Sequence, residues 1–384
     1  MNDRLRRWRL VLGGSDADGT GSTLSGGDLK RDSTLDALYG NDKRRGGLGG
    51  SSPRVARWLG DIRGYFPASV VQVMQRDAMD RLGLRRLLLE PELLESVQPD
   101  VHLVGTLLSL NEAIPERSRQ TAREVVRQVV EELERRLAQP TRQAVTGALH
   151  RAGRTSRPRA GDIDWNRTIL ANLKHYQPAH RTVVPERLIG YGRRLPQLSR
   201  EVVLCLDQSG SMASSVVYAG VFGAVLASVR SLRTRIVAFD TEIADLTDAV
   251  ADPVELLFGV QLGGGTDIAS ALAYCQTQIA NPRDTVFVLI SDLFEGGDND
   301  EMLRRAQALV AGETQVVCLL ALNDEGAPAY DHDNAAALAA LGIPTFACTP
   351  DRFPDLLAAA IEREDLTAWA GAHDITLAAP PADG

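Results

Sequence analysis

The stretch that decides the fold of the C-terminal half is VVLCLDQSGS, residues 202–211. Five apolar residues, 202–206, run without a polar interruption, and a carboxylate and two hydroxyls follow at once. Such an unbroken apolar run is typical of a strand that is buried on both faces of a parallel sheet. Polar groups placed directly after it lie at the carboxyl edge of the sheet, where open α/β sheets bind their ligands.

The same alternation of strand and helix continues along the chain. Further apolar runs lie at 235–239, 285–290, 315–322 and 343–347, and helical patterns lie at 213–231, 266–279, 301–310, 334–341 and 352–361. This order predicts a doubly wound, mostly parallel sheet with right-handed crossovers. A short segment around 241–246 is expected to add an antiparallel edge hairpin. The predicted fold class is therefore α/β, in a domain that covers residues 201–384.

The N-terminal half has a different pattern, and 384 residues suit more than one domain. Residues 1–52 are predicted to be flexible, because 13–52 are rich in Gly, Ser and Asp and have little apolar periodicity. Residues 53–150 carry apolar side chains at helical spacing and predict a mainly α-helical domain. Residues 151–200 are predicted to be a basic linker and extended segment, with an amphipathic helix at 162–174 that carries Trp165 and Leu170.

The two halves carry opposite charge. Residues 1–200 contain 34 basic and 23 acidic side chains (+11), and residues 201–384 contain 8 and 27 (−19). Either the halves dock on each other or each serves its own partner, and two solvated surfaces are the alternative. With no run of eighteen apolar residues and no signal-peptide core, we expect a cytoplasmic protein. Only three of the 42 basic residues are lysine, which is typical of a G+C-rich bacterium.

The cysteines favour a reduced protein without a zinc site. All four lie in apolar contexts of the C-terminal half, without C-x-x-C spacing or nearby histidines; they are Cys205, Cys275, Cys318 and Cys348. We expect them to be core residues with free thiols.

Three loops at predicted strand ends carry oxygen donors. The first holds Asp207, Ser209 and Ser211, the second is a Gly-rich loop with Thr266, and the third holds Asp292. Carboxylate and hydroxyl oxygens held close together suit Mg²⁺ or Mn²⁺. Taken singly, each residue has a plainer interpretation, since Asp and Ser are common in turns and Thr266 could cap a helix. The Gly-rich loop lacks the Lys-Ser/Thr pair of a phosphate loop, so nucleotide binding is not expected.

Together these loops resemble the metal-ion-dependent adhesion site of von Willebrand factor A (VWA) domains. That site has D-x-S-x-S after the first strand, a Thr in a Gly-rich loop and an Asp that ends a later strand. The resemblance implies a Mg²⁺ or Mn²⁺ ion that also accepts a carboxylate from a partner protein. It implies five ligands, bound directly or through water: Asp207, Ser209, Ser211, Thr266 and Asp292. Asp240 and Asp267 match no ligand position, but they are expected near enough to tune the field.

A wider resemblance extends over the N-terminal half. Arg6-Arg7-Trp8-Arg9-Leu10, the loop 46–51, Tyr65-Phe66-Pro67 and Asp164-Trp165-Asn166 are similar to segments of bacterial CoxE-like, MoxR-associated VWA proteins. Members of that class usually act with MoxR-type AAA+ ATPases in protein remodelling, complex maturation or metal insertion. The resemblance implies a cytoplasmic adaptor for such an ATPase.

Two other classes of function compete with an adaptor. The first is a Mg²⁺-dependent hydrolase or phosphotransferase. A phosphotransferase with Asp207 as nucleophile would normally have a second carboxylate two residues on, where Ser209 stands. A serine hydrolase would need an activating base near its nucleophile, yet no G-x-S-x-G motif occurs and no histidine follows a strand in the expected way. We therefore expect no enzyme activity. Nucleic-acid binding could use two arginine clusters, but glutamates interrupt the first, so a solvated face is favoured. The clusters are Arg117, Arg119, Arg123 and Arg127, then Arg151, Arg154, Arg157 and Arg159.

Overall fold

The computed structural model divides the chain into two compact units, Met1–Val129 and Val130–Gly384. The residues that it describes are 10, 24, 26–39, 52–81, 94, 96–152, 154–155, 161, 163–178, 180–191, 200–259, 264–324 and 329–378. The predicted fold class is confirmed, because a helical N-terminal part precedes an α/β part with a mostly parallel sheet.

The first unit is helical in its described residues. It contains α2 (Gly27–Tyr39), α3 (Ser52–Tyr65), α4 (Ala68–Arg81), α6 (Val101–Ser109), the short η2 (Asn111–Ala113) and the beginning of α7 (Glu116–Ala152). Helix α2 lies where the composition predicted loop, so that expectation is wrong for this stretch. Leu38 is buried, and the Trp58 indole N–H on α3 donates to the Thr34 carbonyl at 3.0 Å. Tertiary packing thus supplies what the local pattern lacks.

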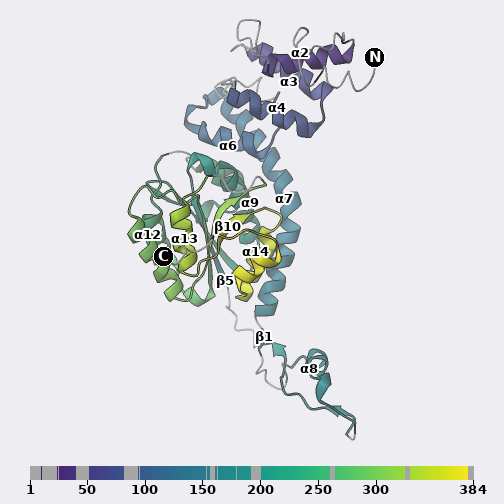
Figure 1. Cartoon of the computed structure of the whole chain (residues 1–384), viewed down its shortest axis with the longest axis vertical. Coiled ribbons are helices and arrows are strands. Elements are labelled where there is room, and N and C mark those ends of the chain that lie inside the picture. The colour runs from purple at the N-terminus through teal and green to yellow at the C-terminus, as the bar shows by residue number, and fades with distance from the viewer. Residues whose placement is uncertain are drawn as a thin grey trace. The chain divides into compact units, whose positions relative to one another are not determined.

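Helix α7 runs from the first unit into the second. Its second half packs along the α/β domain, where Val145 and Ala148 are fully buried (Figure 1). Near the carboxyl ends of two strands, Arg136 pairs with Asp324 at 4.0 Å and with Asp351 at 3.8 Å. The second unit of the structure therefore includes the second half of this helix as well as the residues from 200 onward.

The sheet of the second unit has six strands in the order β10-β9-β8-β5-β6-β7. All neighbours are parallel except β7, which is antiparallel to β6 as expected for the edge hairpin. The bounds are β5 (Arg200–Asp207), β6 (Leu232–Phe239), β7 (Ile243–Asp245), β8 (Thr285–Ile290), β9 (Gln315–Leu322) and β10 (Thr345–Cys348).

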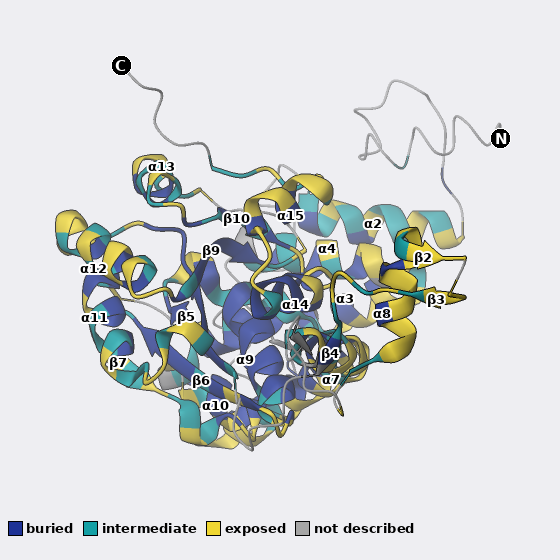
Figure 2. Cartoon of the chain, turned by 90° about the horizontal axis from the view of Figure 1, so that it is seen from below, coloured by how far each residue is buried: buried dark blue, intermediate teal, exposed yellow. Residues whose placement is uncertain are grey.

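Helices cover both faces of this sheet and bury its central strands (Figure 2). On one face α9 (Ala213–Ala227) packs against α10 (Pro253–Gly259) and, through Phe222 and Phe353 with ring centroids 4.6 Å apart, against α14 (Phe353–Glu362). The other face carries α11 (Ile268–Gln278), α12 (Asn299–Ala311) and α13 (His332–Ala340). Helix α15 (Leu366–Ala372) follows α14.

The two edges of the sheet differ from an ordinary open strand. At one edge, β7 is only three residues long and ends in Asp245. At the other, Leu377 forms an antiparallel bridge to Phe346 of β10, and the Ala378 N–H donates to the Thr345 carbonyl at 2.8 Å. Neither edge offers a long row of free backbone groups.

The four cysteines are buried and free, as predicted. Burial raises the pKa of the Cys348 thiol to about 12 and raises the pKa of the Cys318 and Cys205 thiols as well. Thiols with a raised pKa are poor nucleophiles and poor metal ligands at neutral pH, so these residues act in packing.

One helical stretch in the described chain is long and apolar enough to cross a membrane, Gly210–Ala227. It comprises η5 (Gly210–Met212) and α9, and 67% of it is buried inside the domain. Burial of this degree is what the core helix of an α/β fold shows, because strands cover it on one side and helices on the other.

A small module, which we call the arm, spans residues 154–191 between α7 and β5. It comprises β1 (Arg154–Thr155), α8 (Trp165–Ala171), η4 (Leu173–His175), β2 (Tyr176–Gln177), β3 (Thr182–Val183) and β4 (Gly190–Tyr191). Strands β1 and β4 pair at its base, and β2 and β3 form a hairpin at its far end. The predicted amphipathic helix is thus shortened to α8, and the extended segment supplies the strands.

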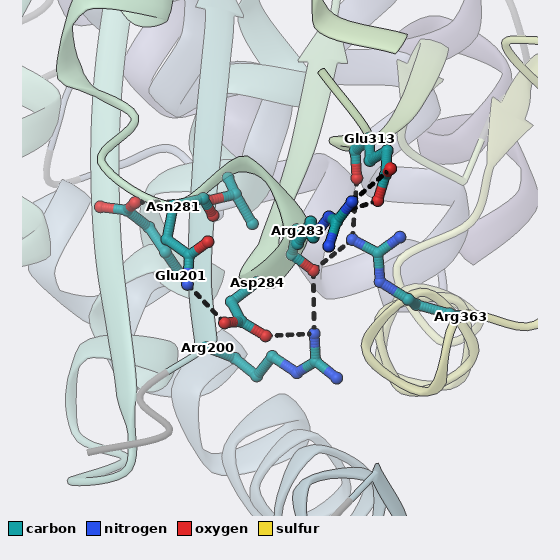
Figure 3. Close-up of polar contacts among 8 residues, drawn as sticks. Arg200, Glu201, Asn281, Arg283, Asp284, Glu313 and Arg363 are labelled. Atoms are coloured by element: carbon teal, nitrogen blue, oxygen red, sulfur yellow. Dashed lines mark hydrogen bonds and ion pairs between the residues drawn. The ribbon is translucent and has the colours of Figure 1, made fainter. Parts of the chain in front are cut away.

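Polar contacts fix the end of the α/β domain from which the arm leaves (Figure 3). Arg200, the first residue of β5, donates to the Asp284 carboxylate at 2.9 Å and to the Arg283 carbonyl at 3.2 Å. Arg363 donates to the Glu313 carbonyl at 2.8 Å and also to the Arg283 carbonyl. Directly before the arm, Arg151 at the end of α7 pairs with Glu362 at 2.5 Å.

Candidate metal centre

Asp207 lies at the carboxyl end of the central strand β5 and is fully buried. One carboxylate oxygen, Oδ1, accepts the Ser209 N–H at 2.8 Å, and the other, Oδ2, accepts the Ser291 hydroxyl at 2.7 Å. The tight turn after β5 therefore forms around the carboxylate itself. It also points Ser209 and Ser211 to the same side, with their hydroxyl oxygens 3.1 Å apart.

Asp292 follows β8, the neighbour of β5 in the sheet, and is 3% exposed. Its Oδ2 accepts the Ser211 hydroxyl at 2.5 Å. Its Oδ1 is buried and has no hydrogen-bond partner. The structure thus brings four of the five predicted ligands, Asp207, Ser209, Ser211 and Asp292, into one hydrogen-bonded chain across two loops.

Thr266, the fifth predicted ligand, is buried beside the Asp292 loop. The Gly296 N–H donates to the Thr266 carbonyl at 2.8 Å, and a Cβ added to Gly296 would lie 2.9 Å from that oxygen, so only glycine allows this approach. Thr266 is not the cap of the following helix, as one interpretation of the sequence had it. The N-cap of α11 is Asp267, whose Oδ1 accepts the Ser270 N–H at 2.8 Å.

Asp240 and Asp267, expected to tune the field of the site, are both engaged in local backbone structure. Asp240 accepts the Glu242 N–H at 2.6 Å through its carboxylate and the Asp267 N–H at 2.8 Å through its carbonyl. Gly264 has a φ of +107° and lies against Asp240, with its virtual Cβ 3.2 Å from Oδ2. The Gly-rich loop is therefore fastened to the loop after β6 as well as to the loop after β8.

Two residues of the site were missed from the sequence. Ser291 holds Asp207, and its hydroxyl also accepts the Leu293 N–H at 3.0 Å. Glu295 accepts the N–H groups of Ile268, at 2.7 Å, and Gly297, at 2.8 Å, so it ties the Gly-rich loop to the Asp292 loop. The only available signal was their position beside Asp292 at the end of a buried strand. Burial raises the pKa of Glu295, and nearby Asp267 adds to the rise.

The electrostatics of the site are those of an anion pair without a counter-charge. Burial raises the pKa of Asp207, the hydrogen bonds from Ser291 and Ser209 lower it, and the charge of Asp292 raises it again. In the described part of the chain neither Asp207 nor Asp292 forms an ion pair with a basic side chain. Two buried carboxylates without a cation are unfavourable, and a bound divalent ion would remove that cost.

The donor set fits a hard cation. It consists of two carboxylates and three hydroxyl groups, from Asp207, Asp292, Ser209, Ser211 and Thr266, and oxygen donors are those that Mg²⁺ and Mn²⁺ prefer. Within the described residues no group of three or more His, Cys, Asp or Glu side chains is placed to hold a metal ion, so sites built only from those residue types find no support. The unpartnered Oδ1 of Asp292 is a free acceptor at the place where the loops converge.

The chain is similar to known proteins over most of its length. Residues 133–357 match the model of the family described as VWA domain containing CoxE-like protein. The uncharacterized protein YehP of Escherichia coli K12 is 38% identical over 363 residues, which cover 92% of this chain and 96% of YehP.

Solved structures match at lower similarity. An aerotolerance-related membrane protein from Bacteroides fragilis has 15% identity and a TM-score of 0.34, and covers 44% of this chain and 98% of its own. The conserved hypothetical protein BatB from Bacteroides thetaiotaomicron has 14% identity and a TM-score of 0.33, and covers 42% and 97%. The family match, which spans more than half of the chain and includes all three loops, shows that this protein belongs to the VWA domain-containing CoxE-like family.

Proposed function

We propose that the protein is a metal-dependent adaptor. Its VWA domain holds Mg²⁺ or Mn²⁺ through Asp207, Ser209, Ser211, Thr266 and Asp292, and a carboxylate of a partner protein completes the site. The observation that carries the proposal is the buried, unpartnered Oδ1 of Asp292 next to a second buried carboxylate. When bound, the ion supplies a positive charge that a partner carboxylate can reach from the exposed side of Ser211.

The residues of the chain prepare this site in advance. Ser291 and the Ser209 N–H orient Asp207, Ser211 orients Asp292, and Glu295 and Gly296 hold the Thr266 loop against the Asp292 loop. Preorganised donors lose little conformational entropy on binding. Because three of the five donors are neutral hydroxyls, the ion would keep more attraction for an external anion than a ring of carboxylates would leave it.

We further propose that the partner is a MoxR-type AAA+ ATPase and that the pair acts in protein remodelling, complex maturation or metal insertion in the cytoplasm. Membership of the CoxE-like family supports this partner, and so does a donor set without an accompanying catalytic motif. We propose accordingly that the protein is not an enzyme.

Metal binding is tested by isothermal titration calorimetry with Mg²⁺ and Mn²⁺. Asp207→Ala should abolish the binding heat, and circular dichroism should show an unchanged helix and sheet content. A folded Asp207→Ala protein with unchanged metal affinity would show that the ligand assignment is wrong.

The partner is tested by co-purification of a MoxR-type AAA+ ATPase from the native cell. The double variant Ser209→Ala with Ser211→Ala should recover much less ATPase than the wild type, and chelator should reduce wild-type recovery to the same level. Ser228→Ala is the matched control, because this serine lies at the opposite end of α9. Equal recovery with all proteins, with or without chelator, would refute a metal-bridged contact.

A further inference from the structure

Among the residues of the arm that the structure describes, polar side chains are buried and the large apolar ones are not. Asn172, which is 2% exposed, donates through Nδ2 to the carbonyls of Thr168, at 2.6 Å, and Arg187, at 2.8 Å. Its Oδ1 accepts the N–H groups of Glu186, at 3.0 Å, and Arg187, at 3.1 Å. The buried Thr168 hydroxyl exchanges two hydrogen bonds with the backbone of Ile189. The backbone of the arm is thereby fixed without the use of its large apolar residues.

Those apolar residues face outward. Within twenty residues the arm exposes six of them, each between 42% and 67%, and they are Trp165, Ile169, Leu170, Leu173, Tyr176 and Val184. Figure 2 shows α8, β2 and β3 almost entirely as exposed elements. Aromatic and aliphatic side chains gathered on a preorganised scaffold are typical of protein interfaces, whereas the surface of a monomer shows them singly. The exposed side chains of the arm are therefore suited to contact with another surface.

The positive charge of the arm region indicates which kind of surface it can contact. Residues 151–199 contain ten basic and three acidic side chains, a balance of +7, whereas residues 201–384 carry −19. Some of the basic groups are already paired within the arm, Arg167 with Asp164 and Lys174 with Glu186, both at 3.8 Å. A complementary surface is acidic and has its own exposed apolar side chains.

Such a surface exists on the α/β domain itself, around the metal centre. Between residues 200 and 378, the described large apolar side chains with high exposure are Phe294, at 50%, and Ile243, at 37%. Phe294 lies two residues after Asp292, which follows β8, and Ile243 pairs with Phe239, the last residue of β6. Both residues therefore lie near the carboxyl ends of the parallel strands. We call this end of the domain the metal-centre face. Exposed carboxylates lie close to them in the same loops, Glu242 next to Ile243, and Asp298 and Asp300 shortly after Phe294.

The arm and this face lie at opposite ends of the domain. The two chain segments that connect the arm to the domain are fixed at the end where β5 begins. Arg151 pairs with Glu362 before the arm, and Arg200 pairs with Asp284 after it (Figure 3). The metal centre lies where β5 ends, at Asp207, and eight residues of strand span about 25 Å. When two complementary surfaces lie at opposite ends of a domain, the arm of one copy can contact the metal-centre face of the next copy. Such a contact between copies is head-to-tail.

We propose that the arm of one copy of this chain docks on the metal-centre face of a second copy. Trp165, Leu170 and Leu173 meet Phe294 and Ile243, and the basic groups of the arm meet the surrounding carboxylates. This contact needs no metal ion, so it stands independently of the proposed adaptor function. It covers the face at which a partner carboxylate would bind, and the two associations therefore exclude each other.

The test is complementation with the full-length protein in analytical ultracentrifugation. The wild type should self-associate reversibly, less at high salt and equally in chelator. Leu170→Glu removes the arm contact and Phe294→Glu removes the face contact, and each alone should weaken association at least about tenfold. An equimolar mixture of the two should form a heterodimer, because each variant keeps the half that the other lacks. Leu29→Glu, a similarly exposed leucine of α2, should assemble like the wild type.

Three results would overturn the proposal. A wild type that stays monomeric at every concentration would show that nothing of this chain covers the arm. Unchanged association of Leu170→Glu would place the contact elsewhere, and variants that fail to complement would exclude the head-to-tail arrangement. Flotation with anionic phosphatidylglycerol vesicles tests whether the arm binds a membrane instead of a second copy. Vesicle binding that Leu170→Glu abolishes would assign the arm to a lipid surface. The −19 charge of residues 201–384 opposes that outcome.

Discussion

Replacement of Asp292 by asparagine should stabilise the metal-free protein and remove its response to metal. In the wild type, Asp292 carries a buried negative charge whose Oδ1 has no partner, close to the buried Asp207. Leaving a buried polar atom unpaired costs about 1–3 kcal/mol, and a charged one more. The asparagine side chain of the Asp292→Asn variant keeps an acceptor for Ser211 and places a neutral amide group where Oδ1 has no partner, so the variant removes the charge and its repulsion with Asp207 but not the unpaired position.

The expected gain is the excess cost of a charged unpaired group over a neutral one, which is of the same order as these values. A stabilisation of about 1–3 kcal/mol corresponds to a rise in Tm of roughly 3–9 °C for a unit of this size. A Mg²⁺ concentration of about one hundred times Kd would stabilise the wild type by about 2.7 kcal/mol, whereas the Asp292→Asn protein would gain much less. The variant should therefore melt at a higher temperature than the wild type in chelator, and this difference should close or reverse in Mg²⁺.

Differential scanning calorimetry in EDTA and in Mg²⁺ measures both effects. Asp365→Asn is the matched control, since Asp365 is an exposed N-cap that accepts the N–H groups of Thr367 and Ala368, and asparagine caps helices equally well. A variant that is less stable than the wild type in EDTA, or a wild type that gains nothing from Mg²⁺ or Mn²⁺, would refute the reasoning.

Three further predictions concern pH, the arm and the core. Because the folded pKa of Asp207 is raised, its contribution to the stability of the metal-free protein is complete below the unfolded carboxyl pKa of about 3.9 and is lost as the pH rises through the raised value. Urea unfolding in EDTA should show this loss, and Asp207→Asn should remove it. Asn172→Ala should abolish hydrogen-exchange protection of the Glu186 amide while the sheet amides keep theirs, and equal protection in both proteins would contradict the role of this side chain. Gly223→Ala places a Cβ 2.1 Å from the Ile236 Cδ1 and should cost about 1–3 kcal/mol in urea unfolding, of which Ile236→Val should restore part.

The α/β part of the fold could be predicted from the sequence because its strands are buried on both faces. Unbroken apolar runs such as 285–290 and 315–322 coincide with β8 and β9 as the structure has them. The order of strand and helix then dictates parallel pairing, since each crossover must return to the same edge. The D-x-S-x-S turn follows β5 immediately, and thus its place at the carboxyl edge followed from the strand assignment.

Other features depend on tertiary contacts that leave little trace in the local pattern. Helix α2 forms in a polar stretch because α3 packs against it, and α7 continues through Pro140 into the α/β unit because that unit covers its second half. The exposed apolar side chains of the arm could not be predicted, because large apolar residues such as Trp165 and Leu170 are usually buried. Ser291 holds Asp207 from a different strand, and no spacing in the sequence signals that contact.

The protection of both sheet edges has a consequence for aggregation. Edge strands with free backbone groups recruit further chains by strand addition, which leads to domain swapping and fibrils. Here β7 is too short and too acidic to act as a template, and the bridge from Leu377 shields β10. Copies of this chain can therefore come into contact without exchanging strands. Contacts made only by side chains dissociate more readily than a shared sheet, so an assembly of this protein should be reversible.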